Sequence, residues 1–236
     1  MTQQTRQNAT EPKEPNTWIE IIITVGIPAF IMMKMSGEAR LGPLWGLVVA
    51  LTFPLVYGIW DLIRRSKWNG FAILGLVSVL LTGGIGLLQL DVKYIAIKEA
   101  AIPAIIGIAV WVSQYTRFPI VQKLLLNPKV LDTEKLHKVL EEKGKRRDFE
   151  QSVNRAGYGI VAAFALSAVL NYVLAKMIVV SPTGTEAFTQ ELGKMTAISF
   201  PVIVLPSMII MLGSIFYLFW QIKRHTEQSI ENFIKE

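Results

Sequence analysis

Cysteine is absent from this chain of 236 residues, and charged residues make up only 18% of it. Without cysteine, disulfides, thiolate metal sites and thiol catalysis are excluded. Histidine occurs only at His137 and His225, both in polar segments, and we interpret both as solvated surface residues. The sequence has no HExxH motif, no GxSxG motif and no carboxylate-rich metal cluster. These absences argue against an enzyme, and they predict neither a metal ion nor a cofactor.

Hydrophobic residues make up 52% of the chain and are collected in long blocks. A bilayer core of about 30 Å is crossed by a helix of about 20 apolar residues. The strands of a membrane β-barrel would alternate in polarity, whereas residues 71–81 are apolar at almost every position. Six blocks have roughly the required length: 18–34, 44–63, 71–90, 94–116, 159–180 and 198–220. We therefore predict an all-α polytopic membrane protein, with a six-transmembrane-helix bundle in residues 18–220.

Basic residues divide unequally between the two sides of such a bundle. With six spans, 18 of the 24 Lys and Arg residues fall on the side of the two termini. Because short basic loops stay cytoplasmic, we expect both termini, 1–17 and 221–236, to be cytoplasmic tails. The first tail lacks the basic region and cleavage site of a signal peptide, so we expect the first span to be retained. This topology accounts for the net charge of +6, and we predict no nucleic-acid partner.

One long loop, residues 117–157, lies on the predicted cytoplasmic side and is amphipathic, with ten basic and six acidic residues. Asp132 is placed to cap a helix that runs to about Glu142, and Gly144 separates it from a second stretch that carries Phe149 and Val153. Such helices can lie in the membrane interface, with their basic residues near anionic lipid headgroups. A solvated connector and a docking site for a partner protein remain as alternatives.

Charged residues inside apolar blocks are costly, so they mark candidate functional sites. Lys98 and Glu99 lie about one turn inside the fourth block. Adjacent helical residues point about 100° apart, so we expect each side chain to face a different neighbour. The candidate neighbours are Gln89, Asp91, Asn171 and Lys176, with Glu191 and Lys194 of a short helix predicted in the outer loop 181–194. We expect Lys98, Glu99 and Asn171 to face one another; the alternative is that Lys98 reaches out to the interface.

Two further acidic residues, Glu20 and Asp61, lie within a turn of the predicted cytoplasmic ends of their blocks. Salt bridges at the interface are one interpretation, and the ends of a polar pathway through the bundle are the other. The glycines of 82–86 lack the lysine of a phosphate-binding loop, so we expect them to permit close helix packing. Prolines occur in four of the blocks, which is a feature of some transporters and of many ordinary membrane helices.

Several strings resemble a family of bacterial inner-membrane proteins that is similar to intracellular septation protein A. The strings are Leu41-Gly-Pro-Leu-Trp, Pro54-Leu-Val-Tyr-Gly, Leu81-Thr-Gly-Gly-Ile-Gly-Leu, Ile97-Lys-Glu-Ala and Leu192-Gly-Lys-Met-Thr-Ala-Ile-Ser-Phe-Pro. The likeness to septation protein A itself rests on the spacing from Asp91 to Lys98 between two spans. The resemblance implies a protein of the bacterial inner membrane with a role in envelope growth or division, and it implies no catalytic residue.

Three classes of function follow from these patterns. The first is a non-enzymatic membrane protein that supports envelope biogenesis or cell division through membrane-protein partners or as a homo-oligomer. The second is a small-solute or lipid transporter or channel that uses Lys98, Glu99 and Asn171. The third, with the least support in the residues, is a membrane enzyme that modifies lipids.

Overall fold

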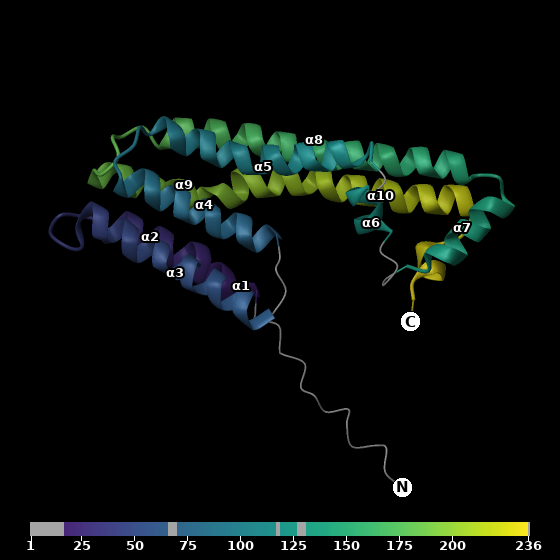
Figure 1. The fold of residues 1–236 in the computed structure, drawn as a ribbon, viewed down its shortest axis with the longest axis horizontal. Helices are drawn as coiled ribbons and strands as arrows, with labels where there is room; N and C mark the ends of the chain where they lie inside the picture. The colour runs from purple at the N-terminus through teal and green to yellow at the C-terminus, as the bar shows by residue number, and fades with distance from the viewer. Residues whose placement is uncertain (1–16, 66–69, 117–118, 127–130, 236) are drawn as a thin grey trace, which may run out of the picture.

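The computed structural model describes residues 17–65, 70–116, 119–126 and 131–235 (Figure 1). Over these residues the regular structure is helical and no strand is formed, which confirms the predicted all-α class. One antiparallel bridge joins Leu131 to Ile234. The predicted tail 1–17 lies almost entirely outside the described residues, as do 117–118 and 127–130 of the predicted cytoplasmic loop.

The first apolar block forms one helix that is widened in its middle. It consists of α1 (Thr17–Ile21), the π-helical turn η1 (Ile22–Gly26) and α2 (Ile27–Lys34). Pro28 lacks an N–H, and its ring would clash with the carbonyl of Thr24 in a regular α-helix. A π turn just before the proline relieves that clash. A second π-helical turn, η2 (Phe200–Val204), ends two residues before Pro206.

The next three helices follow the second to fourth apolar blocks closely. They are α3 (Gly42–Arg65), α4 (Gly70–Leu87) and α5 (Lys93–Ser113). Pro54 and Pro103 lie inside α3 and α5 without ending them. The described apolar part of α4, Ile73–Leu87, is shorter than its neighbours. A tight connection from Leu87 to Lys93 makes α4 and α5 an antiparallel pair.

Two helices are much longer than a bilayer requires. The first, α8 (Arg146–Ile178), has 33 residues, and α9 (Glu186–Ser199), η2 and α10 (Leu205–Thr226) follow one another without a break over 41 residues. At 1.5 Å per residue these helices are about 50 and 60 Å long, against about 30 Å of hydrocarbon. The short helix expected in the outer loop is present as the start of α9, but it is not separate, because α9 continues through η2 into α10.

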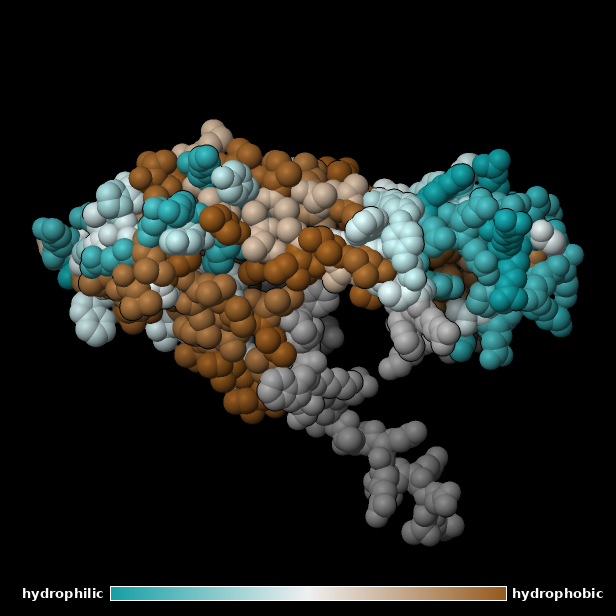
Figure 2. Space-filling view, turned by 45° about the horizontal axis from the view of Figure 1, so that its top comes forward, coloured by the Kyte–Doolittle hydropathy of each residue, from teal (hydrophilic) through white to brown (hydrophobic). Residues whose placement is uncertain are grey.

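Four helical stretches are long and apolar enough to cross a membrane, and they indicate a membrane protein. They are Gly42–Arg64, Lys93–Ser113, Arg146–Ile178 and Glu186–Thr226. Figure 1 shows α5, α8 and α10 running side by side, with α2 and α3 against α4 and α9. In Figure 2 hydrophobic surface covers the middle of this body, and hydrophilic residues gather at its two ends.

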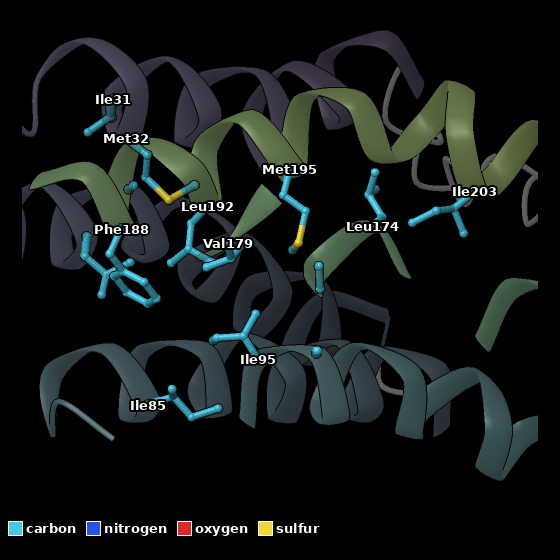
Figure 3. Close-up of a cluster of buried hydrophobic side chains, with 14 residues drawn as sticks. Ile31, Met32, Ile85, Ile95, Leu174, Val179, Phe188, Leu192, Met195 and Ile203 are labelled. Carbon is cyan, nitrogen blue, oxygen red and sulfur yellow. The ribbon is translucent and has the colours of Figure 1, made fainter. Parts of the chain in front are cut away.

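The main core joins the N-terminal helices to α9. Met32, Leu47, Ile95, Phe188 and Leu192 are almost fully buried there (Figure 3). Gly193 permits a close approach of α9 to α2, since a Cβ at this position would lie 2.8 Å from the Cβ of Met32 and 3.0 Å from the carbonyl oxygen of Ala29. The core therefore depends on small residues at helix contacts, as is usual where helices pack in lipid.

Candidate functional site

A polar cluster lies between α4 and α5, in the apolar part of the molecule. The Lys98 ammonium donates to the hydroxyl oxygens of Ser78, at 3.2 Å, and Thr82, at 2.7 Å. Ser78 and Thr82 are one turn apart and therefore share a face of α4. Lys98 thus has a partner in the third apolar block, as the cost of an isolated charge in lipid requires.

Glu99 completes the cluster by pairing with Lys98, whereas the sequence predicted that the two side chains would face different neighbours. Its carboxylate lies 2.6 Å from the Lys98 ammonium, with side-chain exposures of 21% for Glu99 and 6% for Lys98. The expectation that adjacent helical residues cannot pair considered only the directions of their first bonds. The four methylenes of lysine let the ammonium curl back toward its neighbour, and poor solvation strengthens the attraction.

Small residues bring the helices around this cluster close together. A Cβ at Gly86 would lie 2.4 Å from a methyl of Leu47 and 3.3 Å from the ring of Phe188. At Gly83 it would meet a methyl of Leu51 at 3.2 Å. These contacts confirm close packing at Gly83 and Gly86, where α4 lies against α3 and α9, whereas a Cβ at Gly84 would meet nothing within 4 Å.

Asn171 does not join the cluster, so its predicted role there was wrong. Its side-chain amide donates to the Ser167 carbonyl at 2.8 Å and to the Ser167 hydroxyl at 3.3 Å. Both acceptors are one turn back on α8, and this bond inside its own helix satisfies the amide in an apolar setting. Lys176, also on α8, is exposed, with its ammonium 5.7 Å from the centre of the Tyr172 ring.

Gln89 and Asp91 lie outside the cluster as well, in the turn that links α4 to α5. Gln89 is exposed and adopts a left-handed backbone conformation, with φ of 50°. Asp91 accepts from the backbone N–H of Lys93 at 2.9 Å and pairs with its ammonium at 3.0 Å. These two bonds hold the pKa of Asp91 below its ordinary value. Both residues therefore shape the turn rather than the polar cluster.

The remaining candidates occupy three separate places. Glu191 accepts from the backbone N–H groups of Val180 and Ser181, both at 2.9 Å, and so fixes the chain just after α8. Lys194 lies farther along α9 and is exposed. Glu20 and Asp61 are half-buried on α1 and α3, away from the α4–α5 cluster. The structure thus brings together only Lys98 and Glu99 of the predicted set.

Ser78 and Thr82 were missed by sequence reasoning. Serine and threonine in apolar helices commonly bond to their own backbone, as Thr82 does to the carbonyl of Ser78, and this makes them unremarkable. Depth is the signal that would have found them. They precede the end of α4 by about nine and five residues, and Lys98 follows the start of α5 by about five, so an antiparallel pair places all three at similar depth.

A second candidate site is a small helical unit at one end of the molecule. We call it the terminal module; it comprises α7 (Thr133–Glu142), η3 (Ile230–Phe233) and the adjoining ends of α8 and α10. Figure 1 shows it beyond the ends of the other long helices, together with the C-terminus. It has its own core, made by Leu131, Leu136, Leu140, Phe149, Val153, Leu218, Ile222 and Phe233. The short helix α6 (Ile120–Leu125) leads toward it from α5.

Local signals in the sequence predict part of the terminal module. Asp132 accepts from the backbone N–H of Lys135 at 3.0 Å and caps α7, which ends at Glu142 as predicted. Gly144, with φ of 64°, makes the turn into α8. Phe149 and Val153 begin α8 and bury their side chains against α7 and α10, so the apolar face of this stretch packs inside the protein.

Polar bonds close the terminal module around its C-terminal segment. The carbonyl of Phe233 accepts from the N–H of Asp132 at 2.7 Å, and Lys143 pairs with Glu227 at 2.5 Å. His225 lies 3.3 Å from the hydroxyl of Ser152 and packs edge-on against Phe149, so it is no free surface histidine. The C-terminal tail continues α10 as far as Thr226, then turns back and buries Phe233 completely.

Neither site has the composition of a metal centre. Across the described residues, no three His, Asp or Glu side chains converge to hold a metal ion. Comparison of the chain with family models, curated proteins and solved structures yields no match. The resemblance to the septation protein A family therefore stays a prediction.

Proposed function

We propose that this is a non-enzymatic protein of the bacterial inner membrane that supports envelope biogenesis or cell division by contacting membrane or protein partners. The observation that supports this role is the terminal module. Its core is independent of the membrane-facing surface, and its outer residues, such as Glu134 and Lys138, are charged and exposed. A folded unit held at a fixed distance from the bilayer suits the docking of a partner.

The proposal includes six spans with both termini in the cytoplasm. To the four long apolar helices it adds the helix 17–34 and α4, which pack against them in the same body. The helix 17–34 has 18 residues and so has about the minimum length for a span. An even number of spans puts both termini on one side, and because that side carries most of the Lys and Arg residues, the positive-inside rule makes it the cytoplasmic one.

Reporter fusions test the topology. Fusions at residues 67, 140 and 236 are expected to give cytoplasmic signals, and a fusion near residue 187 a periplasmic signal. The opposite pattern would overturn the proposed orientation.

Site-specific crosslinking tests the proposed role. A photo-crosslinking residue in place of Lys138, exposed on α7, is expected to give adducts with specific envelope or division proteins in growing cells. The same residue in place of Thr185, exposed at the start of α9, serves as the control at the other end of the molecule. Adducts of the same pattern from both positions, or none from Lys138, would count against docking at the terminal module.

A transporter or channel is the second candidate, favoured by the ion pair of Lys98 and Glu99 inside apolar helices. Its test is proton flux into proteoliposomes loaded with a pH-sensitive dye, with the wild type, Glu99→Gln and Lys98→Gln compared. Transport through this site predicts flux in the wild type and loss of it in both folded variants. Wild-type liposomes no leakier than empty ones would exclude proton transport under these conditions.

A further inference from the structure

A groove between α8 and α10 opens where these helices leave the apolar part of the molecule. It encloses about 400 Å³ and is lined by Arg155, Ala156, Ile210, Gly213, Ser214 and Tyr217. Small residues create this space. A Cβ at Gly213 would have no neighbour within 4 Å. The two helices are in close contact one residue later, where Ser214 packs directly on Gly159.

Two hydrogen-bond donors of the groove lack acceptors. Within the described part of the chain, no carboxylate pairs with Arg155, and no group accepts from the hydroxyl of Tyr217. Near the start of α8, Arg146 bonds to Glu150 at 3.3 Å, and Lys145, just before the helix, lies 3.2 Å from Asp148. No acidic side chain lines the groove, so its polar end is positively charged.

The donors lie at the depth expected for lipid headgroups. Arg155 precedes by about one turn the point where the apolar block of α8 begins, at Gly159. Tyr158 and Trp220, exposed by 46% and 55%, stand next to the groove residues on the two helices. Exposed Tyr and Trp at the ends of apolar segments mark the headgroup level. Beside these donors the groove walls are apolar, made by Ile210, Gly213 and Ala156.

We propose that this groove binds an anionic phospholipid of the leaflet next to the terminal module. The phosphate accepts from the Arg155 guanidinium and from the Tyr217 hydroxyl, and one acyl chain runs along Gly213 and Ile210. A guanidinium matches a phosphate with two parallel hydrogen bonds. The cytoplasmic leaflet is the one rich in anionic lipid. The proposal rests on the membrane placement proposed above, and it is independent of partner docking.

Native mass spectrometry of the full-length protein in detergent tests this proposal, with phosphatidylglycerol and phosphatidylcholine as probes. The wild type is expected to retain one phosphatidylglycerol about tenfold more tightly than phosphatidylcholine. In Arg155→Gln this preference is lost, whereas Arg147→Gln, which removes an exposed charge of the same helix outside the groove, keeps it. Tyr217→Phe is expected to lose about threefold in affinity for phosphatidylglycerol.

Two further measurements separate the parts of the site. Gly213→Leu fills the apolar part of the groove and leaves Arg155 in place, so it is expected to release both lipids. Glycerol phosphate, which is a headgroup without acyl chains, is expected not to displace the bound lipid at millimolar concentration. Equal retention of the two lipids by the wild type, unchanged preference in Arg155→Gln or full displacement by glycerol phosphate would overturn the proposal. If the reporter fusions gave the opposite orientation while the wild type still preferred phosphatidylglycerol, the proposed topology would be wrong and the lipid site would remain.

Discussion

Lys98 shows how one charged residue is tolerated inside apolar helices. Its ammonium donates to the hydroxyl oxygens of Ser78 and Thr82 and lies 2.6 Å from the Glu99 carboxylate. The carboxylate balances the charge, and the two hydroxyls solvate it. An ammonium held in this way acts first as a clamp between α4 and α5, and a role in transport requires that clamp to open.

Removing one half of this pair leaves the other half as an uncompensated charge. We expect Lys98→Met to destabilise the protein by about 3 kcal/mol, because breaking a buried pair costs about 3–5 kcal/mol and Glu99 is partly exposed. The double variant Lys98→Met/Glu99→Leu should recover most of that loss. Unfolding of the detergent-solubilised protein by denaturant measures both, and equal stabilities of the single and double variants would contradict the clamp.

A second ion pair, Lys143–Glu227, lies at the surface of the terminal module. The hydrogen bond from Lys143 holds the pKa of Glu227 below its ordinary value of 4.5. We expect Lys143→Gln to raise the pKa of Glu227 toward that value, as measured by NMR titration of the carboxyl carbon. Because the folded-state pKa is lowered, the pair stabilises at pH above about 4.5, and its contribution is lost as the pH falls through the folded-state pKa. An unchanged titration would show that the pair does not form in solution.

At the scale of the element, Gly193 controls the contact of α9 with α2. A larger residue there would meet both side-chain and backbone atoms of α2. We expect Gly193→Leu to destabilise the protein by about 1–3 kcal/mol through overpacking. The control is Gly75→Leu on α4, where a Cβ has open space. Thermal unfolding in detergent compares the two, and equal losses would mean that the α2–α9 contact is not tight.

The lengths of apolar blocks predict most of these helices, but not how they continue into polar segments. Arg146 begins α8 and Glu186 begins α9, so the short helical stretches predicted in the two loops are continuous with the long apolar helices. Their polar side chains are used locally, as when Glu191 caps the chain after α8. Such bonds depend on tertiary neighbours, so hydropathy alone cannot reveal them. The cap at Asp132 uses a neighbour in sequence, so it could be predicted. The partners of Lys98 lie on another helix, α4, so they were not found.

At the scale of the whole molecule, two continuous helices join the main core to the core of the terminal module, and a third, smaller cluster of Val110, Val121 and Ile160 lies along α8 between them. The main core lies among α2, α3, α5 and α9, and the core of the terminal module lies at the far ends of α8 and α10. A helix transmits bending and rotation over its length when both ends are packed. The terminal module is thus mechanically connected to the apolar helices through α8 and α10.

Phe233 tests whether the terminal module is a separate cooperative unit. Its ring is completely buried against α7 and α10, and Lys135 donates to the neighbouring carbonyl of Asn232 at 2.9 Å. We expect Phe233→Ala to cost about 3–5 kcal/mol, which would speed hydrogen exchange of the α7 amides by about a hundredfold or more. Amides of α2 and α5 should keep their protection, and Phe216→Ala, which truncates an exposed ring of α10, should change neither region. If α2 and α5 lost protection together with α7, the two cores would form one cooperative unit, and a partner bound to the terminal module would act on the whole bundle.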